Sequence, residues 1–93
     1  QVLLPVEYSI DQVYPNPFNP TTTISVAMPV KADLKVNVYN LNGQLVQVLA
    51  DGQVNAGFHN LTFNASHLST GIYFIHASVP GEWIDVRKVV LVR

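Results

Sequence analysis

The 93-residue sequence has no cysteine and few charged residues, and both absences narrow the possible classes of protein. Without cysteine the chain has no disulfide, no thiolate metal ligand and no thiol nucleophile, so a hydrophobic core alone must hold the fold. Charged residues make up 12% of the chain, against about 25% in an average soluble domain. Because the formal net charge is −1, there is no basic footprint for nucleic acid, and we expect no such partner.

The sequence also lacks any apolar run near the roughly 20 residues that a membrane-spanning helix requires. The longest candidate, residues 86–92, is interrupted by Arg87 and Lys88. We therefore expect no insertion into a membrane. The first residue is Gln1, with no initiator methionine and no signal-type segment, and we interpret the chain as a piece of a longer protein.

β-Branched and turn-forming residues dominate what is present. Fifteen Val and five Ile outnumber nine Leu, and β-branched side chains pack well on a sheet but lose rotamer freedom in a helix. Eight Asn, five Gly and six Pro fall between the apolar runs at short intervals. No window shows the apolar spacing of a helix. Since a chain this short supports a single core, the composition predicts one all-β domain.

The alternation of apolar and polar residues divides the chain into seven expected strands. We interpret residues 1–13 as a linker with a first edge strand, and residues 14–93 as the main domain. After the first strand, the others are expected at 22–28, 34–39, 44–49, 57–63, 72–79 and 82–92, with turns at 40–43, 51–52 and 80–81. This pattern predicts an antiparallel β-sandwich of the immunoglobulin-like or fibronectin-like type, with residues 72–79 as a central strand.

One segment holds three prolines within seven residues, and we call it the proline heptad: Tyr14, Pro15, Asn16, Pro17, Phe18, Asn19 and Pro20. Each proline restricts the residue before it to extended backbone, so the segment is stiff and not helical. We expect Phe18 to be buried and to hold the heptad on the sandwich. Direct contact of the heptad with a receptor is a second interpretation, and it is compatible with this structural role. Three glycines, Gly43, Gly57 and Gly71, are expected at positive-φ or bulge positions rather than at ligand contacts.

Four stretches together resemble the C-terminal sorting domain of type IX secretion, in its type A form. They are the proline heptad with residues 21–24 (TTTI), residues 38–46 (VYNLNGQLV), residues 56–59 (AGFH) and residues 68–74 (LSTGIYF), which contain Gly71 and Tyr73. The similarity extends from about residue 4 to residue 93. The immunoglobulin-like domain of flagellar hook-capping proteins is related and shares much of the pattern. That domain tends to carry Trp-Asp-Gly before its Gly-x-Tyr strand, where this sequence has residues 63–68 (FNASHL).

The resemblance implies a secretion signal and not a catalyst. Domains of that family stand at the C-terminus of proteins that Gram-negative bacteria secrete or display on the cell surface, and Arg93 is then expected to be the chain end. After transit through the periplasm they are recognised by the outer-membrane translocon. A sortase-like peptidase commonly removes them. The resemblance therefore implies an upstream cargo in the same chain, which we expect to be a secreted hydrolase, and no cofactor.

The last strand carries the candidate recognition residues, Arg87, Lys88 and Arg93. A strand edge rich in β-branched residues beside a basic tip suits recognition by strand addition or through a surface patch. The alternative is that these cations are solvated edge charges that prevent unwanted strand pairing.

Other functions have weaker support in the sequence. His59, His67 and His76 are eight and nine residues apart without an accompanying carboxylate cluster, so we expect no metal site. No serine lies in a nucleophile elbow, and we expect no enzymatic activity. A carbohydrate-binding module and a passive stalk domain of a secreted enzyme stay open as alternatives. A sugar platform needs exposed aromatic side chains, and the sequence offers Tyr8, Tyr39, Phe58 and Trp83.

Overall fold

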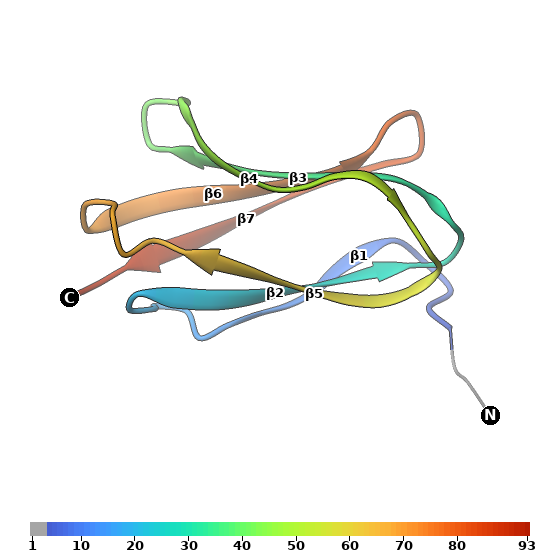
Figure 1. Ribbon diagram of the computed structural model, residues 1–93, viewed down its shortest axis with the longest axis horizontal. Coiled ribbons are helices and arrows are strands. Elements are labelled where there is room, and N and C mark those ends of the chain that lie inside the picture. Colours follow the sequence, from blue (N-terminus) through green and yellow to red (C-terminus); the bar gives the residue numbers. More distant parts are fainter. Residues whose placement is uncertain (1–3) are drawn as a thin grey trace.

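The computed structural model describes residues 4–93 as two antiparallel β-sheets that face one another (Figure 1). The strands are β1 (Ser9–Tyr14), β2 (Thr21–Met28), β3 (Ala32–Asn40), β4 (Leu45–Val54), β5 (Gly57–Asn64), β6 (Gly71–Val79) and β7 (Trp83–Leu91). One sheet has the order β1-β2-β5 and the other β4-β3-β6-β7. The predicted seven-stranded, immunoglobulin-like β-sandwich is therefore confirmed. None of the described residues forms a helix long and apolar enough to cross a membrane.

The core lies between the two sheets, and one face of each inner strand supplies it, as the alternating pattern predicts. The core residues of β2, β3 and β6 are Ile24, Val26, Met28, Leu34, Val36, Val38, Tyr73, Ile75, Ala77 and Val79. Aromatic rings connect the sheets across this core. The ring of Phe63 lies 5.5 Å from that of Phe18 and 6.2 Å from that of Tyr73, measured between centroids. Such tilted and edge-on pairs add to the stabilisation from apolar burial.

The hairpin between β3 and β4 forms at the predicted turn, residues 40–43. The side-chain oxygen of Asn40 accepts hydrogen bonds from the backbone N–H groups of Asn42 and Gln44, both at 3.0 Å. Gly43 has a φ of 82°, a left-handed value that glycine adopts without steric cost. The turn therefore combines a side chain that replaces a backbone acceptor with a residue that tolerates positive φ.

The turn expected at residues 51–52 is wrong. β4 continues to Val54, with Asp51 opposite Lys35 and Gly52 opposite Leu34. An Asp-Gly pair makes a hairpin only where the chain returns to pair with itself, and β5 instead belongs to the other sheet. Two register shifts in the β3–β4 pair, after Val36 and after Val38 on β3, accommodate the longer strand.

β1 is an edge strand of the three-stranded sheet and pairs with β2. Its Ile10 is buried in the core, and Val13 packs against the core. Ordered structure therefore begins before residue 14. Residues 1–3 of the expected linker lie outside the described residues, and the division of the chain after residue 13 remains a prediction.

Candidate functional site

The proline heptad lies along the outer edge of β7, the last strand of the four-stranded sheet. The N–H of Phe18 donates to the carbonyl oxygen of Val90 at 2.9 Å, and the N–H of Val92 donates to the carbonyl oxygen of Phe18 at 2.9 Å. These two bonds make a short parallel bridge between Phe18 and Leu91. The heptad thus supplies a neighbour for the C-terminal half of β7.

The side chain of Asn16 extends this pairing by one step. Its Nδ2 donates to the carbonyl oxygen of Lys88 at 3.0 Å, and its Oδ1 accepts from the N–H of Val90 at 3.1 Å. Pro15 and Pro17 have no N–H to offer to a strand edge. Because a carboxamide carries both a donor and an acceptor, the Asn16 side chain takes the place of a backbone peptide group.

Three further contacts fix the heptad on the sandwich. The ring of Phe18 is 1% exposed and packs on Phe63, so the structure places it in the core, as its position between prolines predicts. The hydroxyl of the buried Thr22 donates to the carbonyl oxygen of Pro15 at 2.7 Å. The N–H of Ala65 donates to the carbonyl oxygen of Pro20 at 2.9 Å. The other six heptad side chains are exposed, and their contact with a receptor remains a prediction.

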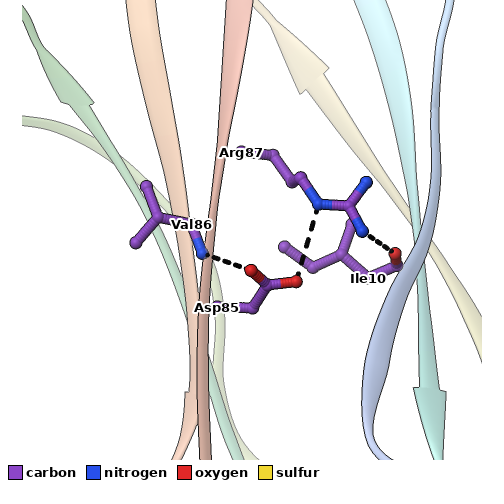
Figure 2. Close-up of polar contacts among 4 residues, drawn as sticks. All are labelled: Ile10, Asp85, Val86 and Arg87. Atoms are coloured by element: carbon purple, nitrogen blue, oxygen red, sulfur yellow. Dashed lines mark hydrogen bonds and ion pairs between the residues drawn. The ribbon is translucent and has the colours of Figure 1, made fainter.

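The N-terminal half of β7 is closed in a different way (Figure 2). Asp85 Oδ1 accepts from the N–H of Val86 at 2.8 Å, and Asp85 Oδ2 lies 3.5 Å from Arg87 Nε. Val86 is on the same edge as Lys88 and Val90, because alternate residues of an antiparallel strand direct their N–H groups to the same side. The carboxylate therefore satisfies an edge donor that another strand would otherwise use.

Arg87 connects β7 to the other sheet. Its Nη2 donates to the carbonyl oxygen of Ile10 in β1 at 2.7 Å, as Figure 2 shows. In the sheet register Arg87 stands opposite the buried Ile75, which places it on the inward-facing side of β7. A charged donor to a backbone carbonyl is one of the stronger hydrogen bonds in proteins. This residue holds the two sheets together at their common edge.

The connection between β5 and β6 is held from two sides. Arg93 donates to the carbonyl oxygen of Leu68 and, at 3.4 Å, to that of Ala65. The hydroxyl of Tyr73, a residue of the resemblance, donates to the carbonyl oxygen of Ser69 at 2.6 Å. Gly71 follows with a φ of 149°. The end of the described chain and the start of β6 are thereby joined through one loop.

Lys88 differs from the two arginines. Its side chain is exposed, and within the described part of the chain its ammonium group has no hydrogen bond or ion pair. It stands opposite Phe74, on the face of the sheet that points away from the core. The structure therefore does not bring the three predicted recognition residues into one patch. Their role in recognition remains a prediction.

Within the part of the chain that the structure describes, the remaining predicted positions do not come together in a catalytic or ligand-binding site. Gly57, like Gly43 and Gly71, has a positive φ, and an added Cβ would meet no atom within 4 Å at any of the three. Among the described residues there is no group of three or more His, Cys, Asp or Glu that could hold a metal ion. An open hollow is lined by residues 78–84 of the β6–β7 hairpin, and the ring of Trp83, one of these residues, stacks on the ring of Tyr8 with 5.9 Å between the centroids.

Sequence reasoning missed Asn16 and Asp85 as residues that close the β7 edge. A signal for Asn16 was present, because both of its neighbours are prolines, which have neither a backbone N–H nor a hydrogen-bonding side chain. For Asp85 no signal existed, since a lone acidic residue in a strand is compatible with many surroundings. Long-range pairing decides the role of Asn16, whereas Asp85 contacts only Val86 and Arg87 and closes an edge because β7 is the last strand of its sheet.

The fold and the contacts define the class of domain. It is a small all-β sandwich with the stiff proline heptad along its last strand. The sequence matches the secretion system C-terminal sorting domain over residues 12–92, from within β1 to the residue after β7. The chain belongs to this family, whose members are sorting signals for type IX secretion and not catalysts. This role implies export from a Gram-negative bacterium to its surface or surroundings. Comparison with curated proteins and with solved structures gives no match.

Proposed function

We propose that this chain carries an upstream cargo in the same polypeptide to the outer-membrane translocon of type IX secretion, after transit through the periplasm. A sortase-like peptidase then separates the cargo from the sorting domain. The observation that carries this proposal is the family match, because it spans the heptad and all of β2 to β7. The cargo is expected to be a secreted hydrolase.

A closed β7 edge supports a signal that acts in the folded state. An open edge would pair with other chains during export, and natural sheets suppress such pairing with short extra strands, charges or prolines. Here the heptad and Asp85 perform that role. A folded domain also presents its recognition surface without an ordering cost at the moment of binding.

Within this function the three cations have different roles. We assign Lys88 to contact with the secretion machinery, because its ammonium group is free within the described residues. Arg87 and Arg93 hold backbone carbonyls of Ile10, Ala65 and Leu68. They support the recognition surface by keeping β7 and the β5–β6 loop in place. The sorting domain proper comprises residues 14–93, with residues 1–13 as the linker and first edge strand.

The test is a fusion of a fluorescent cargo, with an export signal at its N-terminus, to residues 1–93 in a host that has type IX secretion. We expect the cargo at the cell surface or in the medium, and mass spectrometry should find it without the sorting domain. The same cargo without residues 1–93 is the control and should stay in the periplasm. Equal delivery of both cargoes, or retention of both, contradicts the proposal.

A further inference from the structure

The two outer faces of the sandwich have opposite character. On the three-stranded sheet most outward residues are polar and uncharged, and the others are Tyr14, Ala27 and Phe58; the polar ones are Ser9, Gln12, Thr21, Thr23, Ser25, Asn60, Thr62 and Asn64. On the four-stranded sheet the outward residues of β4, β6 and β7 include seven apolar ones, which we call the outer apolar face: Leu45, Val48, Ile72, Phe74, Ile84, Val86 and Val90. An antiparallel sheet that faces water on one side is expected to be polar there.

The register places five members of this face side by side on β6 and β7, whereas Asn37 and Tyr39 of β3 lie between them and the two members on β4. Leu45, Tyr39, Phe74 and Lys88 form one row across the four strands, and Val48, Asn37, His76 and Val86 form the next. Four members of the face are strongly exposed: Ile84 by 65%, Leu45 by 53%, Val48 by 50% and Val86 by 49%. Single exposed apolar residues are ordinary, whereas a continuous apolar surface marks a site of interaction.

The charges on this sheet face indicate the chemistry of the partner. Lys35 stands opposite Asp51 in the register, so these two charges offset one another. Lys88 stands opposite Phe74, with Val86 and Val90 two residues away on the same strand and face. A lone ammonium among apolar side chains is complementary to a carboxylate in an equally apolar surface, where the surrounding contact excludes water.

Other occupants fit this surface less well. A second copy would offer on the same face only Asp33 and Asp51, and Asp51 already faces Lys35. An anionic lipid surface is bound by several cations together, and among the described residues of this face Lys88 is the one cation without an acidic residue opposite it in the register. A sugar requires an open aromatic plane, but the Tyr39 ring meets His76 edge-on at 6.0 Å and 84°.

We infer that the outer apolar face, with Lys88 between Val86 and Val90 on β7, is the docking surface for a protein of the secretion machinery that presents a carboxylate among apolar side chains. This inference rests on the proposed function. Recognition then uses the side chains on the sheet face and not the edge of β7, which the heptad and Asp85 close.

Export of the fluorescent cargo fused to residues 1–93 tests the inference with two variants of the face. Ile84→Thr with Val86→Thr removes apolar surface and keeps β-branched residues, and Lys88→Glu reverses the free charge. The matched controls are Phe58→Thr, which removes an exposed ring from the polar face, and Lys31→Glu, which makes the same charge change in the β2–β3 connection. Thermal melting of each purified variant establishes that it is folded.

We expect both face variants to lower the amount of exported cargo about tenfold or more, as for charged and apolar contacts at the centre of an interface, while both controls match the wild type. Equal export of face variants and controls overturns the inference and leaves the proposed function intact. If the wild-type fusion itself is not exported, the proposed function fails and the inference falls with it.

Two further measurements test whether a second copy or a lipid surface occupies the outer apolar face instead. Sedimentation equilibrium showing a wild-type dimer that Ile84→Thr with Val86→Thr converts to a monomer would assign the face to a second copy. Co-sedimentation with vesicles of phosphatidylethanolamine and phosphatidylglycerol that Lys88→Glu abolishes would assign it to a lipid surface. Either result contradicts a protein partner, and we expect a monomer that does not bind vesicles.

Discussion

The two edge strands of the four-stranded sheet, β7 and β4, are protected in different ways. Along β7, backbone and side-chain groups of the distant heptad pair with residues 88–92, and Asp85 caps the N–H of Val86. β4 is ten residues long and carries two register irregularities, which increase local twist and make regular pairing with another strand less favourable. Within the described chain no further strand or hydrogen-bonded segment covers its outer edge.

Both edges are protected against pairing with another strand, but the two kinds of protection differ in their sensitivity to mutation. Protection of β7 depends on a few specific residues, and a single substitution can remove it. Protection of β4 resides in backbone geometry that many residues support. We therefore expect mutations at the β7 edge to have larger effects on stability and association than mutations along β4.

The largest effect is expected for Phe18→Ala, which removes the ring that anchors the heptad in the core. Truncation of a fully buried aromatic residue costs about 3 to 5 kcal/mol, because apolar contacts are lost and a cavity remains. Urea unfolding of both forms measures this difference. The neighbouring Tyr14→Ala is the control, since its ring is 69% exposed, and it should change stability by less than about 0.5 kcal/mol. A loss below about 1 kcal/mol for Phe18→Ala would show that the heptad is not anchored there.

A smaller effect is expected for Asn16→Ala, which removes both side-chain hydrogen bonds to β7. We expect a loss of about 1 to 2 kcal/mol, because each bond contributes about 0.5 to 1.5 kcal/mol and the site is exposed. The variant should also associate more readily, since part of an edge becomes free, and light scattering detects this. Asn19→Ala changes the same residue type within the heptad and should behave like the wild type. Identical stability of Asn16→Ala and Asn19→Ala would contradict the role of Asn16.

Arg87→Met tests the connection between β7 and β1. The substitution keeps most of the aliphatic stem and removes the donor to the carbonyl oxygen of Ile10, so we expect a loss of about 1 kcal/mol in urea unfolding. The ion pair with Asp85 contributes little, because its two side chains are 45% and 33% exposed. Raising the salt concentration should therefore change the stability of the wild type only slightly. A wild-type stability that falls strongly with salt would assign the role of Arg87 to the ion pair instead.

On β4 the expected effect is small and has the opposite sign. The side-chain oxygen of Gln47 is buried and has no hydrogen-bond partner among the described residues. Gln47→Met replaces the amide with an apolar group of similar length, and we expect a gain in stability of about 0.5 to 1 kcal/mol, because an unsatisfied buried acceptor is removed. Thermal melting followed by circular dichroism measures the change. Destabilisation of this variant would show that the amide has a function on β4.

Local pattern was sufficient to predict the sandwich, the turn at residues 40–43 and the burial of Phe18, because alternation and turn chemistry act over a few residues. It was not sufficient to place the heptad against β7, since Phe18 and Leu91 meet across most of the chain. The same reason explains why the contacts of the two arginines were not predicted. Arg87 and Arg93 were predicted as recognition residues from their charge, and both contact carbonyl groups of distant segments that no local signal identifies.

The turn expected at residues 51–52 failed for a related reason. Asp-Gly is a strong turn signal only between two strands that pair with each other, and the sequence does not state which sheet the next strand joins. The apolar outward face of β7 had a visible signal, because residues 83–92 contain apolar side chains at both alternating positions. That pattern normally indicates a strand buried on both faces, and here β7 is an edge strand with one face exposed.

The heptad acts as the missing neighbour of β7, and amide hydrogen exchange measured by NMR tests this role most directly. The N–H groups of Val90 and Val92 should be protected in the wild type, because Asn16 and Phe18 accept their hydrogen bonds. In Asn16→Ala the exchange of Val90 should accelerate by about tenfold, with a smaller change at Val92. Rapid exchange of both amides in the wild type would contradict the pairing of the heptad with β7.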